Sequence, residues 1–290
     1  MLVWAIIIKC HERLAISFLL AFTNDPVELA IRSNSKEHQG VPMDLRLKGK
    51  RIIVTGASKG IGRAITTCLL NEGARLAICG RDEDRLSQAT SELSALGEIH
   101  GKSCDLSNLE QTTAFVDWAA EQLGGLDILI SNVSAGGGAS FRECVDTDIM
   151  GAQALMRGSL SHMQDQSGAN IICISSRAAS MGIPFLQSYA AVKAATISMV
   201  KSMAMEVAPR GIRVNAVSPG DIEFDGGAWG EAKLHNPKVY AQFLSENPLG
   251  RMGRLDEIAD VVTFIASERA SLVSGANILV DGAATKGLQI

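Results

Sequence analysis

The 290-residue sequence has no excess of charge of one sign large enough to point to a polyanionic partner. It carries 27 lysines and arginines against 31 aspartates and glutamates, which gives a formal net charge of −4 and a pI near 5.8. Because nucleic-acid binding needs a basic surface that meets the phosphate backbone, this balance argues against nucleic acid as the main ligand. A small molecule that carries phosphate remains compatible with it.

The sequence also lacks the cysteine and histidine spacings of a metal site. Its six cysteines lie far apart, with no Cys-x-x-Cys and no pair of histidines at ligand spacing, so we expect no bound metal. Cys79 and Cys173 fall inside apolar, strand-like runs, where a thiol packs as a small hydrophobic group. Unpaired buried thiols favour a reducing compartment, and we predict a cytoplasmic protein.

A long apolar run is missing as well, although the first 42 residues differ from the rest. Residues 1–8 are apolar but are followed by a charged stretch at 9–13, and residues 14–22 are too few to span a bilayer. No basic residue precedes the first apolar run, which argues against a signal peptide. We interpret residues 1–42 as an N-terminal extension, poorly ordered or added by a start codon assigned too far upstream, and residues 43–290 as one domain.

What the sequence does contain is a regular alternation of short β-branched runs and longer helical patterns. This alternation is typical of βαβ units, and it predicts an α/β fold with a seven-stranded, doubly wound parallel sheet and helices on both faces. Ligands of such sheets bind beyond the carboxyl ends of the strands. The expected strands lie near 51–55, 75–79, 98–103, 126–131, 170–175, 212–217 and 276–280, and the expected helices near 60–72, 82–96, 108–123, 142–165, 188–208 and 255–267.

A glycine-rich loop follows the first expected strand and begins the first expected helix. It reads Thr55-Gly56-Ala57-Ser58-Lys59-Gly60-Ile61-Gly62. Small residues at this point let the backbone approach a pyrophosphate at the positive end of the helix dipole. The loop lacks the Lys-Ser/Thr ending of a Walker loop, and its Gly-x-x-x-Gly-x-Gly spacing differs from the more general Gly-x-Gly-x-x-Gly pattern.

Tyr189 and Lys193 stand four residues apart in the expected helix 188–208, with Ser176 thirteen residues before Tyr189. On a helix, residues i and i+4 share one face, so the ammonium group can lie beside the phenol and favour its ionised form. By itself, such a pair more often lies on a solvated surface than in an active site. The glycine loop is what favours the catalytic interpretation.

With these motifs in order, the chain resembles the short-chain dehydrogenase/reductase family over essentially all of residues 45–290. Further landmarks that match are Asp105 after the third strand, Asn132 after the fourth, Arg213-Val214-Asn215-Ala216-Val217-Ser218-Pro219-Gly220, Pro248-Leu249-Gly250-Arg251-Met252-Gly253 and Val280-Asp281-Gly282. The resemblance implies a single Rossmann domain. It also implies an oxidoreductase that moves hydride between a nicotinamide cofactor and a carbonyl or secondary alcohol.

The resemblance implies a role for each site residue. Tyr189 is expected to be the general acid/base, Lys193 to assist it and bind the nicotinamide ribose, and Ser176 to hold the substrate oxygen. The expected cofactor-binding residues are Gly56, Ser58, Lys59, Gly60, Ile61, Gly62, Arg81, Asp105, Leu106, Asn132, Tyr189, Lys193, Pro219, Gly220 and Ile222.

The residues after the second strand favour NADP over NAD. An acidic residue there would bind the ribose hydroxyls of NAD and repel a 2′-phosphate, but position 80 is glycine. Arg81 and Lys59 could instead meet the 2′-phosphate of NADP. The alternative is that Arg81 pairs with Asp82 or Asp84 on the following helix.

Two departures from the family concern the site itself. Asp148 stands where the family commonly has an asparagine that positions a water in the proton relay, and an ionised carboxylate only accepts hydrogen bonds. We count Asp148 with the catalytic residues, and whether it pairs with Lys193 is open at this point. Phe224 stands where a threonine often binds the nicotinamide amide, so the backbone of Ile222 is expected to replace it.

Residues 221–247 form a long insertion with glycines and several aromatic side chains, and we predict that they form a lid over an apolar substrate. The alternative is a lid whose aromatic side chains pack on one another and do not contact the substrate. The predicted protein is an NADP-dependent enzyme acting on a small to medium apolar carbonyl or alcohol, with a 3-oxoacyl reductase among the options. The alternative is a catalytically weak NADP-binding sensor on the same fold. The resemblance further implies a homodimer or homotetramer. The charge balance and the short apolar runs lead us to expect no nucleic-acid and no membrane partner.

Overall fold

The computed structural model describes residues 43–287. The predictions about residues 1–42 therefore lie outside the described residues. From Leu45 onward the chain forms one compact unit. Within the described part of the chain, no helix is both long and apolar enough to cross a membrane.

A seven-stranded parallel sheet forms the centre of the domain, as the sequence predicts. Its order is β3-β2-β1-β4-β5-β6-β7, so the winding direction reverses between β1 and β4. The strands are β1 (Arg51–Thr55), β2 (Arg75–Gly80), β3 (Ile99–Ser103), β4 (Ile128–Ser131), β5 (Asn170–Ile174), β6 (Arg213–Pro219) and β7 (Asn277–Val280). β1, β4 and β5 are almost wholly buried, as expected for strands that are covered on both faces.

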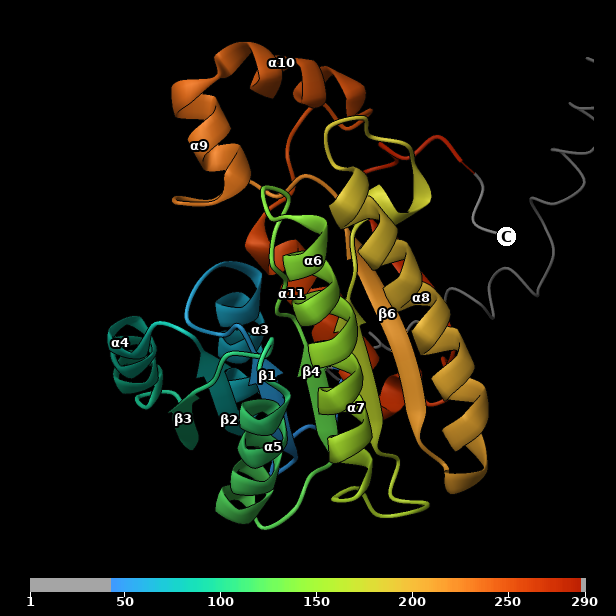
Figure 1. The fold of residues 1–290 in the computed structure, drawn as a ribbon. Helices are drawn as coiled ribbons and strands as arrows, with labels where there is room; N and C mark the ends of the chain where they lie inside the picture. Colours follow the sequence, from blue (N-terminus) through green and yellow to red (C-terminus); the bar gives the residue numbers. More distant parts are fainter. Residues whose placement is uncertain (1–42, 288–290) are drawn as a thin grey trace, which may run out of the picture. The chain divides into compact units, whose positions relative to one another are not determined.

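Helices cover both faces of the sheet (Figure 1). One face packs against α3 (Gly60–Asn71), α4 (Glu83–Leu93) and α11 (Leu255–Ala266), and the other against α5 (Leu109–Leu123), α7 (Ala152–Leu160) and α8 (Gln187–Val207). Local signals set the helix ends. α5, for example, begins where the Asn108 side chain accepts hydrogen bonds from the backbone N–H of Glu110 and Gln111, and it ends at Gly124 with φ of 74°.

The helix predicted over 142–165 differs from the structure. The chain forms a short α6 (Phe141–Cys144), a π-helical segment η1 (Val145–Gly151) and then α7, which ends at Leu160. Wider turns of this kind insert an extra residue into the helical ladder, and the periodicity of the sequence does not reveal them. The π-helical segment contains Asp148, one of the predicted catalytic residues.

The 221–247 segment contains two helices, α9 (Ala228–His235) and α10 (Pro237–Glu246). Figure 1 places them beyond the carboxyl ends of the strands, above the end of β6. The segment leaves the sheet after Gly220. Its first residues pair with the chain that follows the segment, through a bridge between Ile222 and Gly253. It therefore lies at the edge of the sheet where ligands of this fold class bind.

Candidate active site

The glycine loop between β1 and α3 is a tight turn with almost no room for side chains. A Cβ at Gly62 would lie 2.3 Å from the Gly56 carbonyl oxygen and 2.6 Å from Nδ2 of Asn132. Gly56 and Gly60 adopt φ angles of 64° and 57°, a region that side chains disfavour. Without side chains at these glycines, a ligand can approach the backbone closely at the amino terminus of α3, which fits a cofactor pyrophosphate.

Asn132, at the end of β4, braces this loop from the neighbouring strand. Its Nδ2 donates to the carbonyl oxygens of Thr55 (3.1 Å) and Gly56 (3.2 Å), and its backbone N–H donates to the Thr55 hydroxyl (2.9 Å). The amide thus fixes the loop at the point where the sheet order reverses. In this geometry Asn132 supports the cofactor site rather than the reacting atoms.

A cavity of about 350 Å³ extends from the glycine loop along the ends of β2 and β3. Its lining includes Arg81, Arg85 and Lys59, and it has no acidic residue at position 80. Asp82 pairs with Arg85 at 3.0 Å and caps α4 instead of binding Arg81. Within residues 43–287 the Arg81 side chain has no hydrogen bond or ion pair, although its charge adds to the Ser140 hydrogen bonds that lower the pKa of Glu143. Arg81 can therefore meet an anion in the cavity.

Two further predicted cofactor residues lie after β3 and behave differently. Leu106 lines the cavity together with Cys104, whereas Asp105 is not among its lining residues. The Asp105 carboxylate accepts hydrogen bonds from the Ser107 N–H (3.0 Å) and hydroxyl (2.8 Å).

Two other predicted cofactor residues belong to the glycine loop. Ser58 lies beside Gly80, since a Cβ at that glycine would be 3.3 Å from the serine Oγ. Ile61 packs against the core.

Ser176, Tyr189 and Lys193 all follow β5 in the chain and lie on two elements that pack against each other. Ser176 caps a short 3₁₀ helix, η2 (Arg177–Ser180), with its Oγ accepting from the Ala178 N–H at 3.1 Å. Tyr189 lies in the first turn of α8, which packs against η2, and Lys193 follows one turn later. The Lys193 Nζ lies 5.6 Å from the centre of the Tyr189 ring.

The Lys193 ammonium is buried in an ion pair with Asp148. Nζ lies 3.0 Å from Asp148 Oδ1 and donates to the Ile174 carbonyl at 3.1 Å, while Oδ2 of Asp148 accepts from the Ala135 N–H at 2.9 Å. The exposed fractions of the two side chains are 4% and 1%. Burial alone would lower the pKa of Lys193, but attraction to Tyr189 and Asp148 outweighs it, and the pKa is raised. The sequence had left this pairing open.

Phe224 lies against the glycine loop rather than in the substrate region. A Cβ at Gly60 would be 2.8 Å from Phe224 Cζ, and one at Gly227 would be 2.6 Å from the edge of the same ring. The ring therefore sits between two glycines and lines the cofactor cavity. Any cofactor that occupies the loop must share this space with the ring.

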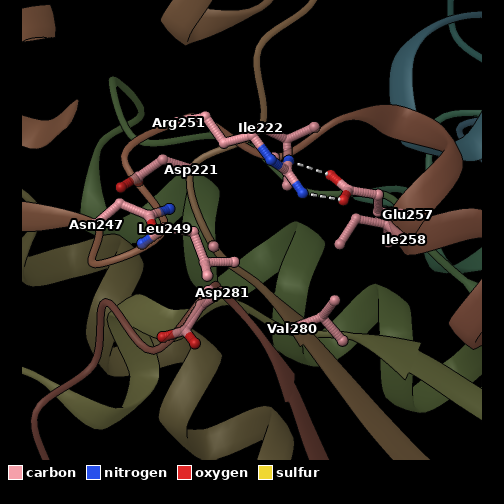
Figure 2. A pocket seen from close by; sticks show the side chains of 12 residues that line it. Asp221, Ile222, Asn247, Leu249, Arg251, Glu257, Ile258, Val280 and Asp281 are labelled. Atoms are coloured by element: carbon pink, nitrogen blue, oxygen red, sulfur yellow. Dashed lines mark hydrogen bonds and ion pairs between the residues drawn. The ribbon is translucent and has the colours of Figure 1, made fainter.

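Gly220 and Ile222, which were predicted to bind the cofactor, line a second cavity of about 170 Å³ (Figure 2). It lies where β6 and β7 end, and Pro219 pairs with Val280 in the sheet beside it. Asp221, Asn247 and Asp281 also line it, and the Arg251–Glu257 ion pair spans one side. None of the residues of the glycine-loop cavity lines this second cavity.

A family model described as enoyl-(acyl carrier protein) reductase matches residues 56–285, which include the glycine loop, Ser176, Tyr189 and Lys193. The chain belongs to the short-chain dehydrogenase/reductase family. This confirms the resemblance that the sequence motifs indicated, and with it the single doubly wound domain.

Relatives in the family act on different molecules. The chain is 31% identical over 255 residues to 2-(S)-hydroxypropyl-CoM dehydrogenase 3 of Xanthobacter autotrophicus, an alignment that covers 84% of this chain and 99% of the relative. Among solved structures, L-sorbose reductase of Gluconobacter frateurii with NADPH and L-sorbose is 29% identical, with a TM-score of 0.78, and the match covers 85% of this chain and all of the other. A 7α-hydroxysteroid dehydrogenase with NADH and a 7-oxo bile acid is 30% identical with the same TM-score, covering 85% and 98%.

Against this family background, two buried residues beside the site escaped the sequence analysis. Arg177 follows Ser176 directly, and Asp221 follows Gly220, yet the structure joins them in an ion pair. The only sign of them in the sequence is a charged residue directly after each motif. Neither residue lies in a periodic stretch that would predict its burial. Arg85, which lines the cofactor cavity, was missed as well.

Proposed function

We propose that this short-chain dehydrogenase/reductase is an NADP(H)-dependent enzyme that interconverts a carbonyl and a secondary alcohol on a small to medium apolar substrate. The main support is the placement of Tyr189 one helical turn from a buried, charged Lys193, beside the turn that Ser176 caps. A protein that only binds a dinucleotide has no need of an acid/base group held in this way. The glycine loop supports the cofactor part of the proposal.

In this proposal each side chain handles the oxygen and proton of the reaction. Bound NADPH supplies the hydride for reduction. The Ser176 hydroxyl donates a hydrogen bond to the carbonyl oxygen, and the Tyr189 hydroxyl gives that oxygen its proton as negative charge develops there. The Lys193 ammonium stabilises the tyrosinate that remains. Asp148 and the Ile174 carbonyl hold the ammonium in place, and oxidation of an alcohol uses the same groups in reverse.

NADP is the proposed cofactor because Arg81 lines the cavity without a hydrogen bond or ion pair among residues 43–287, and no acid stands at position 80. We expect Arg81→Ala to raise the KM for NADPH about tenfold or more and to change the KM for NADH little, since only NADPH carries the 2′-phosphate. Steady-state kinetics with both cofactors measure this. Arg75→Ala, at the opposite end of β2, is the control. Equal effects on the two cofactors would refute the NADP assignment.

The substrate side is proposed to be apolar, with the 221–247 segment acting as a lid. Trp229 and Phe243 of this segment lie 4.7 Å apart between ring centres, and Phe185, in the loop before α8, lies 6.1 Å from Phe243. This aromatic cluster (Phe185, Trp229 and Phe243) supports an apolar cover. The 3-oxoacyl thioesters remain within this substrate class.

The decisive experiment is a panel of carbonyls and alcohols followed by the absorbance of NADPH. We expect turnover by the wild type and a loss of at least about 10²-fold in Tyr189→Phe, because the proton donor is removed. The sequence has two tyrosines, so Tyr240→Phe is a matched control that should keep nearly full activity. Full activity in Tyr189→Phe would rule out the mechanism.

A catalytically weak NADP sensor is the second candidate. It is favoured by two departures from the family pattern, the carboxylate of Asp148 on Lys193 and the ring of Phe224 against the glycine loop. Tight NADPH binding, measured by calorimetry, with no turnover on the panel would favour it over the enzyme.

A homodimer or homotetramer through the region of α7 and α8 is also proposed. Met205 on α8 is 73% exposed, which supports a covered surface there. Sedimentation velocity of the wild type and of Met205→Lys tests the assembly. The cytoplasmic location remains a prediction.

A further inference from the structure

Arg177 is a buried arginine directly beside the proposed catalytic serine. It is the first residue of η2, and only 2% of it is exposed. Arginine is almost never fully buried unless its charge is paired, because removing a charge from water costs several kcal/mol. The surroundings of this side chain therefore indicate what it is for.

The partner of Arg177 is Asp221, the first residue of the 221–247 segment. Nε donates to Oδ1 at 3.2 Å, and Nη2 lies 2.7 Å from Oδ2, so the Nε and Nη2 fork of the guanidinium faces the carboxylate with one hydrogen bond and one ionic contact. The exposed fractions of the side chains are 3% and 10%. Asp221 also accepts the Gly253 N–H on its backbone oxygen at 2.8 Å. The ion pair thus fixes the point where the segment leaves the sheet and where its second arm returns.

The same guanidinium contacts the far part of the segment. Its Cζ lies 5.7 Å from the centre of the Phe243 ring on α10, and Nη1 contacts the Met181 sulfur at 3.4 Å. Phe243 is 6% exposed and belongs to the aromatic cluster that joins α9, α10 and the loop before α8. Arg177 therefore touches the beginning of the segment through its charge and the second helix through its flat face.

A different use of Arg177, as a receptor for an anionic substrate, conflicts with these contacts. Two of its nitrogens face Asp221, and a third faces a sulfur. Asp221 also experiences the negative charges of Glu246 and Asp281, so Arg177 is the cation that balances them. Withdrawing it to bind a substrate anion would leave the buried Asp221 carboxylate without its cation.

We propose that Arg177 is the positioning residue that holds the 221–247 segment over Ser176 and Tyr189, through Asp221 at the foot of the segment and Phe243 on α10. Because Arg177 follows Ser176 directly, the segment and the serine share one rigid attachment. Loss of this attachment lets α9 and α10 open, so the substrate loses its cover. The cofactor cavity loses only what Phe224 contributes to its lining, while its other lining residues lie outside the segment. The proposal rests on the proposed function where it concerns substrate, but its structural part can be tested without any substrate.

The structural test is limited proteolysis of the full chain with trypsin in the presence of NADPH. Lys233 on α9 and Lys238 on α10 give cleavage sites within the segment, and mass spectrometry identifies them. We expect Arg177→Met to be cut there at least about fivefold faster than the wild type. Arg177→Lys should be intermediate, since it keeps the charge but loses the fork and the flat face. Arg75→Met removes an arginine ion pair on β2 and should not change the rate.

The functional test is the split between kinetic constants on the substrate found in the panel. We expect Arg177→Met to raise the KM for that substrate about tenfold or more, with kcat lowered less and the Kd for NADPH changed less than the KM, because Phe224 is the only residue of the segment that lines the cofactor cavity. An unchanged rate of segment cleavage together with an unchanged KM would overturn the proposal. A fall in kcat alone, with the segment still protected, would also overturn it, because the arginine would then act on Ser176 only.

A second pair of variants keeps the test decisive if Arg177→Met does not fold. Phe243→Leu keeps the ion pair and removes the ring, and Asp221→Asn keeps the shape and removes the charge, and each should speed cleavage within the segment. If neither does, the proposal is wrong. If the wild type turns over no substrate while the variants still show faster cleavage, the proposed function fails and the positioning role stands.

Discussion

Two buried ion pairs flank Ser176, and they differ in what they join. Lys193 and Asp148 meet at 3.0 Å between α8 and the π-helical segment, entirely within the Rossmann domain. Arg177 and Asp221 meet at 2.7 Å between the turn after β5 and the beginning of the 221–247 segment. The first pair sits where a proton is proposed to move, and the second where one part of the chain is held against another. The Lys193–Asp148 pair thus keeps a charged group at the proposed reaction site, whereas the Arg177–Asp221 pair holds a chain segment in position.

The two pairs also differ in their electrostatic balance. At Lys193, attraction to Tyr189 and Asp148 outweighs burial and raises the pKa, so the ammonium stays charged. At Asp221, burial is the largest influence and raises the pKa, while Arg177 only partly opposes it. Neither pair is expected to add much net stability, because desolvation offsets the attraction between buried charges. Removing one partner, however, should be costly at both sites.

The largest effect should follow from Lys193→Met. It leaves the Asp148 carboxylate buried without its cation, and we expect a loss of about 3–5 kcal/mol in the free energy of unfolding, measured by denaturant titration. Catalytic turnover should be lost as well. Lys201→Met, two turns further along α8 on the surface, is the matched control and should change neither quantity.

The double variant Lys193→Met with Asp148→Leu separates stability from catalysis. We expect it to recover most of the lost stability, because no charge is left buried, and to stay inactive. Recovery of activity would mean that the reaction does not need the Lys193 ammonium. The Lys193–Asp148 pair would then have only a structural role, like the Arg177–Asp221 pair.

Asp148→Asn should have a smaller effect on stability than Lys193→Met. It removes the anion of the buried pair, but the amide oxygen can still accept the Ala135 N–H, and the Lys193 ammonium keeps its hydrogen bond to the Ile174 carbonyl. We therefore expect a loss of about 1–3 kcal/mol in the free energy of unfolding, measured by denaturant titration. A loss as large as that of Lys193→Met would show that these two hydrogen bonds contribute little.

The smallest effect concerns Asp221 and the pH dependence of stability. Its pKa in the folded protein is raised above the ordinary 3.8, chiefly by burial, so the folded state holds this proton more tightly than the unfolded state does. The carboxyl therefore favours folding at low pH, and that contribution is lost as the pH rises from 3.8 through the folded pKa. Over this window the Tm of Asp221→Asn should rise relative to the wild type, by about 2 °C.

Calorimetric scans at several pH values measure that difference in Tm. A relative fall over the same window would mean that Arg177 stabilises the carboxylate more than burial disfavours it. The two ion pairs would then be alike in their electrostatic balance.

Much of the fold could be predicted from local sequence, and the errors follow a pattern. Strands and helices came within a few residues of their predicted ends, since periodicity and end signals such as Asn108 and Gly124 act over a few neighbours. The helix predicted over 142–165 was wrong in its interior and at its end, because a π-helical turn is stabilised by packing that periodicity does not record. The extra residue changes which side chains of this helix face the active site, and Asp148 is one of them.

The site divides in the same way. The sequence by itself determined the glycine loop, Ser176, Tyr189 and Lys193, because each depends on a residue type at a fixed short spacing within one strand, turn or helix. Only the tertiary structure decided that Asp148 pairs with Lys193, that Phe224 lies on Gly60, and that Arg177 meets Asp221 and Phe243. These contacts join residues from 44 to 164 positions apart. Burial and packing, not local propensity, set their energies, so the same sequence motifs could have accommodated other partners.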